Sequence, residues 1–312
     1  MKKWTDEEID YAFSLLEEFN QYSFVTRGLQ DAGFDRTYDS VQKMFKRYEE
    51  ESYPSGPKVL LLDIETLPII TYSWGIWKQN LSDFQIIEDW CLLSWSAKWL
   101  GDSYIYSDIL TPNEAVNRKD KRICKTMWNL LDECDLVIAH NGDRFDLRKL
   151  NARFMNHRMD PPSPYLSIDT LKQSRRNFAF TTHKLDFLSQ IISNKEKIKT
   201  DFALWRGCDN GDVSSLNKML SYNKHDVLLL EEVYLSMLPW MKGIPNFALY
   251  TSSNKTICGH CGSSDLKKNG FYVTPANKYQ SYKCMECGCF VRDRISSLSK
   301  EQKQNLKINL AK

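Results

Sequence analysis

The feature that most constrains this chain is a short apolar run that ends in two acids. Val59-Leu60-Leu61-Leu62 comes directly before Asp63 and Glu65. A continuous apolar run predicts a strand that is covered on both faces. Residues two apart in a strand point to the same side, so these two carboxylates would repel each other unless cations bridge them. Because Mg²⁺ and Mn²⁺ prefer oxygen ligands, the segment predicts a site for hard divalent ions.

A third acid follows a second apolar strand. Residues 135–139 read Asp-Leu-Val-Ile-Ala, and the following His-Asn-Gly predicts a turn. From Arg144 onward the apolar residues have helical spacing, which places Asp146 in the first turn of a helix. Open α/β sheets place their sites at the carboxyl ends of strands, so we expect Asp146 to lie near the first two acids.

The fourth acid lies on a helix. Apolar residues recur at helical spacing between 216 and 234, and Tyr222 and Asp226 share one face of that helix. The Tyr222 hydroxyl could hydrogen-bond an attacking water there. Two metal ions about 3.5–4 Å apart can generate hydroxide and stabilise the leaving 3′ oxygen of a phosphodiester. An isolated Asp-x-Glu is more often a solvated strand end. The three acidic segments described here, in this order along the chain, nevertheless favour a nuclease.

Taken together, the three segments resemble the exonuclease motifs of the DEDD superfamily, which has a ribonuclease H-like fold. The matching residues are Asp63-Ile64-Glu65-Thr66, Asn141-x-x-x-Phe145-Asp146 and Tyr222-x-x-x-Asp226. The tyrosine is typical of the DEDDy branch, which contains the proofreading domains of DNA polymerases. The residues between motifs two and three are similar to those of family B polymerases. The resemblance covers residues 58–240.

This resemblance implies removal of nucleotides from 3′ ends with two Mg²⁺ or Mn²⁺ ions. The expected metal ligands are Asp63, Glu65, Asp146 and Asp226, with Tyr222 as the residue that orients the water. Residues that would contact the terminal nucleotides are Thr66, Leu67, Asn141 and Phe145. We therefore predict an α/β protein with a ribonuclease H-like mixed sheet flanked by helices. We expect it to act as a 3′–5′ exonuclease on DNA. Two alternatives stay open: a DNA-binding or recruitment protein with an inactive nuclease fold, and a structure-selective endonuclease.

The segment from Ile69 to Trp90 has no counterpart in these motifs. It carries Trp74, Trp77 and Phe84. Such rings could stack on the bases of a single strand or could simply belong to the hydrophobic packing, and the sequence leaves both readings open.

Two cysteine pairs near the C-terminus resemble a zinc ribbon. Cys258 and Cys261 form one Cys-x2-Cys knuckle and Cys284 and Cys287 the other, which predicts four thiolate ligands for one structural Zn²⁺. We interpret the nearby Cys289 as a spare thiol and His260 as part of a turn, with replacement of a zinc ligand by either residue as the alternative. The chain has nine cysteines, an odd number, and opens without an apolar signal segment. We therefore expect a reducing cytoplasm, of a bacterial or phage-infected cell, and not a secreted disulfide protein.

Basic residues surround this ribbon. Residues 251–312 hold eleven Lys and Arg against four Asp and Glu. Four of the cations are our candidates for contact with a nucleic-acid backbone: Lys267, Lys268, Lys283 and Arg292. A purely stabilising ribbon with a solvated charged face is the alternative.

The first 53 residues predict three helices. Thr5 and Glu8 form a capping box, and the unit resembles Myb/SANT-like helix-turn-helix domains. Lys43, Lys46 and Arg47 lie on the outer side of its third helix and are candidate DNA contacts. Seven basic residues face twelve acidic ones here, so a protein partner remains an alternative to DNA.

These patterns divide the chain into four parts. We expect the helical module over 1–53, the exonuclease domain over 54–250, the zinc ribbon over 251–298 and a basic tail over 299–312. The sequence has no run of eighteen apolar residues, so it predicts no membrane span.

Overall fold

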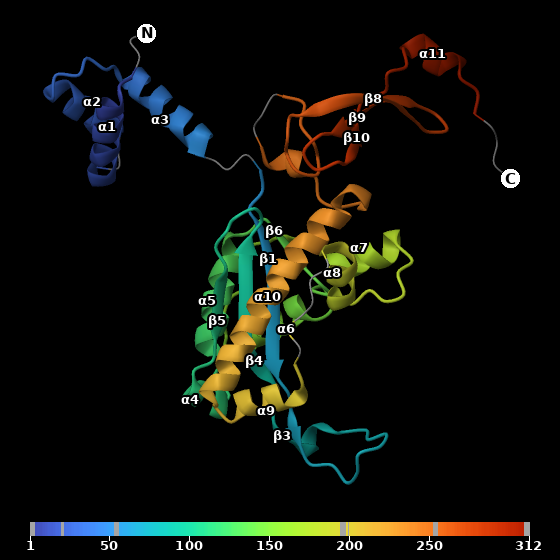
Figure 1. Cartoon of the computed structure of the whole chain (residues 1–312). Helices are drawn as coiled ribbons and strands as arrows, with labels where there is room; N and C mark the ends of the chain where they lie inside the picture. Colours follow the sequence, from blue (N-terminus) through green and yellow to red (C-terminus); the bar gives the residue numbers. More distant parts are fainter. Residues whose placement is uncertain are drawn as a thin grey trace. The chain divides into compact units, whose positions relative to one another are not determined.

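The computed structural model describes residues 4–19, 22–52, 56–193, 198, 200–251 and 255–308. It divides into two compact units, Met1–Ser55 and Gly56–Lys312 (Figure 1). The larger unit carries a five-stranded sheet in the order β5-β4-β1-β6-β7. These strands are β1 (Val59–Leu67), β4 (Cys91–Trp99), β5 (Tyr106–Ile109), β6 (Leu136–Ala139) and β7 (Leu166–Asp169).

The sheet is mixed, as the sequence predicted. Strand β1 lies at its centre, antiparallel to β4 and parallel to β6. β4 pairs antiparallel with β5, and β6 pairs parallel with β7. A mixed sheet flanked by helices confirms the predicted ribonuclease H-like fold class.

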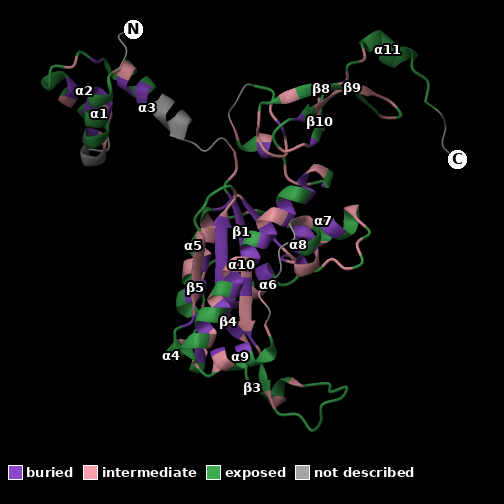
Figure 2. Ribbon diagram, in the orientation of Figure 1, coloured by how far each residue is buried: buried purple, intermediate pink, exposed green. Residues whose placement is uncertain are grey.

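Both faces of β1 are covered, which explains its continuous apolar run. Leu60 and Leu62 belong to the core on one face, whereas Val59 and Leu61 belong to the core on the other. Figure 2 shows the central strands and much of the long helix α10 (Val213–Met237) as buried. This helix contributes residues to both cores, so it is tied to the whole sheet.

The remaining helices of this unit surround the sheet. They are α4 (Pro112–Val116), α5 (Lys121–Glu133), α6 (Asp146–Asn156), α7 (Thr170–Asn177), α8 (Leu185–Ser193) and α9 (Phe202–Asp209). Two short strands, β2 (Ile70–Thr71) and β3 (Ile86–Glu88), pair with each other outside the main sheet, with the 3-10 turn η1 (Asp83–Gln85) before β3. Two further 3-10 turns, η2 (Leu238–Trp240) and η3 (Phe247–Tyr250), follow α10.

The C-terminal part forms a three-stranded sheet in the order β10-β9-β8. Its elements are β8 (Leu266–Val273), β9 (Lys278–Cys284), β10 (Phe290–Arg292) and the short helix α11 (Lys300–Asn305). The cysteine end of this sheet shares one core with the end of α10, where Cys258 and Cys284 pack with Met237 and Leu238. Cys289 adds a hydrogen bond from its thiol to the Leu238 carbonyl, at 3.5 Å.

The smaller unit has three helices, α1 (Asp6–Phe19), α2 (Tyr22–Asp31) and α3 (Tyr38–Ser52). Val25, Leu29 and Val41 are fully buried between them. The predicted capping box is present, because the Thr5 N–H donates to the Glu8 carboxylate at 2.8 Å. Lys43 is exposed, whereas the side chains of Lys46 and Arg47 lie outside the described residues.

Within the part of the chain that the structure describes, no helix is both long enough and apolar enough to cross a membrane.

Candidate metal-dependent nuclease site

Three of the four predicted carboxylates meet at one point. Strand β1 supplies Asp63 and Glu65, and α10 supplies Asp226 from its middle. Their ligand oxygens all lie within 4.8 Å of one another. They line a cleft of about 650 Å³ together with Asp146 and Tyr222. A cluster of oxygen donors this close suits hard divalent cations, which is the chemistry that the sequence pattern predicted.

A break in strand pairing lies directly beside these acids. Glu65 pairs with Ser94, but the next residue, Thr66, pairs with Leu92, so one residue of β4 is skipped. Such bulges bend a strand and are common next to active sites. The Leu67 side chain is fully buried, so only its main chain could contact a nucleotide.

Asp146 is the most deeply buried of the four acids. It begins α6, is 2% exposed, and accepts a hydrogen bond from the Ile64 N–H at 3.1 Å. Its carboxylate is thus held against β1 between the two acids of that strand. Burial raises the pKa of Asp146 to about 7, and the charge of Asp169 acts in the same direction. A nearby cation would favour the ionised form and offset this cost.

The turn that leads into α6 places the predicted nucleotide contacts. Asn141 has a φ of 70° and donates its N–H to Asp169 at 3.1 Å. At Gly142 an added Cβ would lie 2.5 Å from the Ala139 side chain, so the turn requires glycine. Asn141 and Phe145 both line the cleft, and Phe145 is 38% exposed.

One residue that the sequence analysis missed holds Asp63 in place. Asn223 is fully buried, and its amide donates to the Asp63 carboxylate at 2.6 Å and to the Asp63 carbonyl at 3.2 Å. The Asn223 oxygen in turn accepts from the Ser94 hydroxyl at 3.3 Å. The adjacent Tyr222 lines the cleft and packs edge-on against Trp205. The sequence feature that could have indicated a role for Asn223 is its position between Tyr222 and Asp226.

The same cleft is also lined by cations to which the sequence analysis assigned no role. Arg175 and Lys184 are exposed and line the cleft. His140 also lines the cleft, with its ring nitrogens 2.9 Å from the Thr170 hydroxyl and 2.9 Å from the His183 carbonyl. Cations that line a cleft together with carboxylates are suited to hold a phosphate there.

A second buried acid, Asp120, has a structural role. Arg153 forms two bonds of 2.6 Å to its carboxylate, and the Leu92 N–H and the His157 ring add bonds of 2.8 and 2.6 Å. Burial opposes ionisation, but these hydrogen bonds lower the pKa of Asp120 below its ordinary value. Cys124 lies nearby. Because protein donors already occupy both carboxylate oxygens, this cluster fastens α6 to β4 and does not resemble a metal site.

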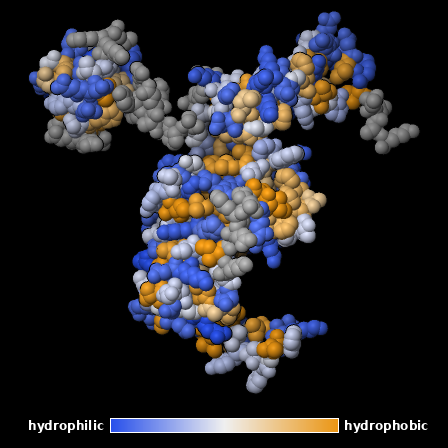
Figure 3. Space-filling view, viewed as in Figure 1, coloured by the Kyte–Doolittle hydropathy of each residue, from blue (hydrophilic) through white to orange (hydrophobic). Residues whose placement is uncertain are grey.

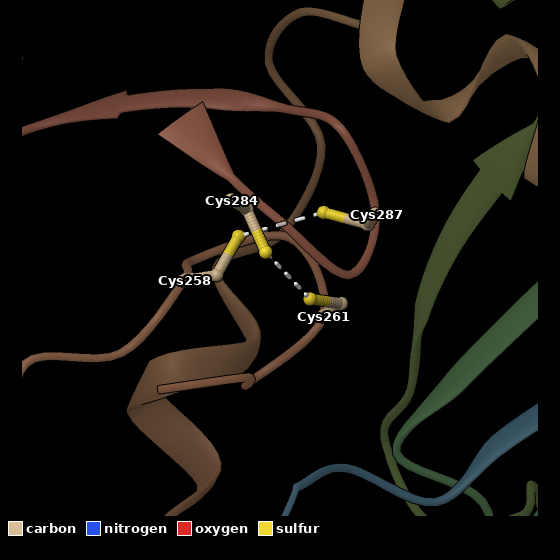
Figure 4. A group of neighbouring side chains, drawn as sticks. All are labelled: Cys258, Cys261, Cys284 and Cys287. Atoms are coloured by element: carbon tan, nitrogen blue, oxygen red, sulfur yellow. Dashed lines mark hydrogen bonds between the residues drawn. The ribbon is translucent and has the colours of Figure 1, made fainter. Parts of the chain in front are cut away.

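The four predicted cysteines also meet at one point (Figure 4). The sulfurs of Cys258 and Cys287 are 3.7 Å apart, and those of Cys261 and Cys284 are 3.6 Å apart. Four thiolates around Zn²⁺ with bonds of about 2.3 Å would have sulfurs about 3.8 Å apart. A disulfide would require about 2.05 Å. The thiol group therefore fits a structural zinc.

Neither alternative ligand belongs to this group. Cys289 points to the Leu238 carbonyl, and His260 donates its backbone N–H to the Cys258 sulfur at 3.4 Å. The predicted basic residues of the ribbon are exposed: Lys267, Lys268, Lys283 and Arg292. Lys267 pairs directly with Lys283 across β8 and β9. Like charges opposite each other are unfavourable without an anion, so this pair suits a phosphate backbone.

Comparison with known proteins agrees with the fold. Residues 101–238 match the family RNase_H_2, described as RNase_H superfamily. This match includes Asp146, Tyr222 and Asp226 but begins after β1. The match covers less than half of the chain and supports the ribonuclease H-like fold; this fold together with the acidic cleft points to a nuclease in general.

One solved structure has a weak similarity to this chain. It is a family B DNA polymerase from the hyperthermophilic archaeon Pyrobaculum calidifontis, with 15% sequence identity and a TM-score of 0.44. The likeness covers 61% of this chain and 26% of the polymerase chain. A comparison with curated proteins finds no match.

Proposed function

We propose that this protein is a divalent-metal-dependent 3′–5′ exonuclease that acts on DNA. The observation that carries the proposal is the convergence of Asp63, Glu65 and Asp226, whose ligand atoms lie within 4.8 Å of one another in a cleft. The motif order of the DEDDy branch supports the 3′–5′ direction. The presence of every acidic ligand supports activity over an inactive nuclease fold.

Each wall of the cleft has its own task in this proposal. Asp63, Glu65, Asp146 and Asp226 hold two Mg²⁺ or Mn²⁺ ions, which supply an activated water and stabilise the leaving oxygen when bound. Tyr222 orients the water from α10, one helical turn before Asp226. Asn141 and Phe145 bind the terminal nucleotide through its sugar and base. Arg175 and Lys184, which line the same cleft, hold its phosphate.

The test uses single-stranded DNA labelled at its 3′ or 5′ end. Wild-type protein should release the 3′ label first, with Mg²⁺ or Mn²⁺ but not with EDTA. Asp63→Ala should abolish cleavage while leaving the circular dichroism spectrum unchanged, because the residue is only partly buried. Cleavage that persists in this variant would refute the proposed metal ligands.

A circular single strand separates the exonuclease from an endonuclease. An exonuclease requires an end, so the circle should stay intact at enzyme concentrations that degrade the linear strand. Linearisation of the circle would show that the same cleft cuts internally, and the proposal would then be wrong about the mode of attack.

We further propose that the ribbon binds one Zn²⁺ and contributes to DNA binding through Lys267, Lys268, Lys283 and Arg292. Arg292 supports this role because its guanidinium lies 4.0 Å from the Tyr279 ring centre, an arrangement that offers both charge and a flat surface to a strand. For the N-terminal helical module we propose a Myb/SANT-like binding unit, in which Lys43, Lys46 and Arg47 contact DNA or a protein partner. We also propose the domain boundaries expected from the sequence, at 1–53, 54–250, 251–298 and 299–312.

A further inference from the structure

The segment between β1 and β4 presents apolar side chains that nothing in the described chain covers. We name residues 69–90 the aromatic arm. Trp74 is 99% exposed, Phe84 87% and Trp77 81%. Burial of such a ring is worth about 1.5–3 kcal/mol, none of which is gained here. The packing explanation for these rings, which the sequence had left open, is therefore wrong in this structure.

The arm is a built element of the fold. Its two strands β2 and β3 pair with each other, and the Tyr72 N–H donates to the Gln85 carbonyl at 3.0 Å. At its base, Arg118 donates to the carbonyls of Pro68 and Asp89 at 2.7 and 2.9 Å. The Arg118 guanidinium thus binds the main chain at both ends of the arm and holds these ends together. The arm projects from the domain at this point (Figure 1).

That place adjoins the nuclease cleft. The arm begins four residues after Glu65, and it ends at Trp90. The Lys149 ammonium lies 3.6 Å from the Trp90 ring centre and 5.7 Å from the centre of Phe145, which lines the cleft. A row of aromatic and cationic groups therefore runs from the cleft to the base of the arm.

The chemistry of the outer part of the arm favours one kind of partner. Between Tyr72 and Ser82 the only charged side chain is Lys78, and the three acids of the arm lie outside this stretch. The stretch offers exposed indole rings, one cation and the amides of Gln79 and Asn80. Figure 3 shows hydrophobic side chains exposed on this arm at the lower end of the view. Flat rings with an occasional cation are the usual platform for unpaired bases.

We propose that the aromatic arm binds the unpaired DNA strand behind its 3′ end, with bases stacked on Trp74 and Trp77. This deepens the proposed function, since it makes a single-stranded tail of several nucleotides the preferred substrate. Lys149 and Trp90 guide the strand from the arm to Phe145 in the cleft.

The test compares a long substrate with a short one in the full chain. The long substrate is a twelve-nucleotide oligothymidylate, and the short one is the p-nitrophenyl ester of thymidine 5′-monophosphate, which reaches only the metal site. Trp74→Ala/Trp77→Ala should raise the KM for the oligonucleotide at least about tenfold, since each stacked base contributes about 1–3 kcal/mol. The rate for the ester should not change.

Two matched variants isolate stacking. Trp74→Phe/Trp77→Phe keeps flat rings and should retain most of the affinity. Ile76→Ala removes an 86% exposed aliphatic side chain from the same part of the arm and should leave the KM unchanged. An unchanged KM in the double alanine variant would overturn the proposal and assign the arm to a protein contact. An equal loss in Ile76→Ala would overturn the stacking of bases.

A binding measurement keeps this test separate from the proposed nuclease activity. Fluorescence anisotropy of the labelled oligonucleotide in EDTA reports the arm without cleavage. If the wild-type protein cleaves neither substrate but the double alanine variant still weakens binding at least about tenfold, the arm assignment stands while the proposed exonuclease fails. If binding is equal in the two proteins, the arm assignment fails.

Discussion

Asn223 shows how a neutral residue can fix the position of a carboxylate, Asp63, that we propose as a metal ligand. Its amide hydrogens are both directed to Asp63, one to the side chain and one to the main chain. Ser94 fixes the amide orientation from the opposite side. Partners of this kind orient a metal ligand without touching the metal. They commonly contribute about 10- to 100-fold to metal affinity or activity.

Asn223→Asp should therefore impair the site although it changes very little volume. A second carboxylate beside Asp63 repels it, so we expect kcat to fall roughly 10- to 100-fold and the Mg²⁺ concentration for half-maximal activity to rise. A Mg²⁺ titration of the cleavage rate checks this. Asn217→Asp places the same change at an exposed position of α10 and should behave like wild type. An unaltered Mg²⁺ curve in Asn223→Asp would remove this residue from the site.

At the scale of elements, the Asp120 cluster determines where α6 lies. It joins the start of α5, the body of α6 and the first pairs of β4 through Arg153, His157 and the Leu92 N–H. Helix α6 begins with Asp146, so this buried cluster positions one end of the cleft.

Arg153→Met should destabilise the larger unit severely. It leaves the buried Asp120 charge without its main partner, which typically costs about 3–5 kcal/mol. The free energy of unfolding in urea, followed by circular dichroism, measures this loss. Arg122→Met is the matched control, because Arg122 also forms ion pairs, with Asp108 and Glu114, but its side chain is 44% exposed, and we expect a loss below about 1 kcal/mol. Equal losses in the two variants would contradict the assigned role of burial.

The N-terminal helices carry a buried ion pair that predicts a pH dependence. Arg36 donates to Glu8 at 2.7 Å, and this bond lowers the pKa of Glu8 to about 2. The folded-state pKa lies below the ordinary value, so the pair stabilises fully above pH 4.5, the ordinary pKa, and the stabilisation is lost as pH falls toward 2. The carboxyl carbon resonance of Glu8 should titrate near pH 2, and in Arg36→Met it should titrate at clearly higher pH. A wild-type titration at the ordinary value would contradict the prediction.

At the scale of the whole molecule, the four-cysteine end of the C-terminal sheet shares one hydrophobic core with the end of α10. Cys258 and Cys284 are fully buried against the end of α10, and the same helix carries Asp226 near its middle. Loss of the ribbon structure would expose Met237 and Leu238, which are 2% and 3% exposed in the intact structure.

Cys284→Ser should therefore affect more than the ribbon. We expect loss of bound zinc, measured by atomic emission, together with a lower Tm of the nuclease unit and a lower rate of cleavage. Cys289→Ser is the control within the same loop, because Cys289 lies outside the four-sulfur group and its hydroxyl replacement can keep the bond to Leu238. Full zinc content in Cys284→Ser would show that other ligands hold the metal.

The sequence predicted those parts of the fold and site that depend on local patterns, and it missed those that depend on contacts between residues far apart in the sequence. The three acidic segments were found because strand alternation and helical spacing are local patterns, and the four cysteines because their spacing is a local motif. The role of Asn223 was missed because it depends on contact with a residue 160 positions away. Arg175 and Lys184 were missed for the same reason. The exposure of Trp74 was left undecided because an aromatic residue gives the same sequence signal in a core and on a surface.

The length of the chain between Asp63 and Asp226 has a consequence for biosynthesis. The N-terminal end of a chain leaves the ribosome first, so β1 emerges long before α10, the helix that contributes to both cores. Domains fold as units during synthesis, and contacts between distant segments form last. The acidic cluster that we propose as the metal site is therefore incomplete on a nascent chain until α10 has emerged from the ribosome.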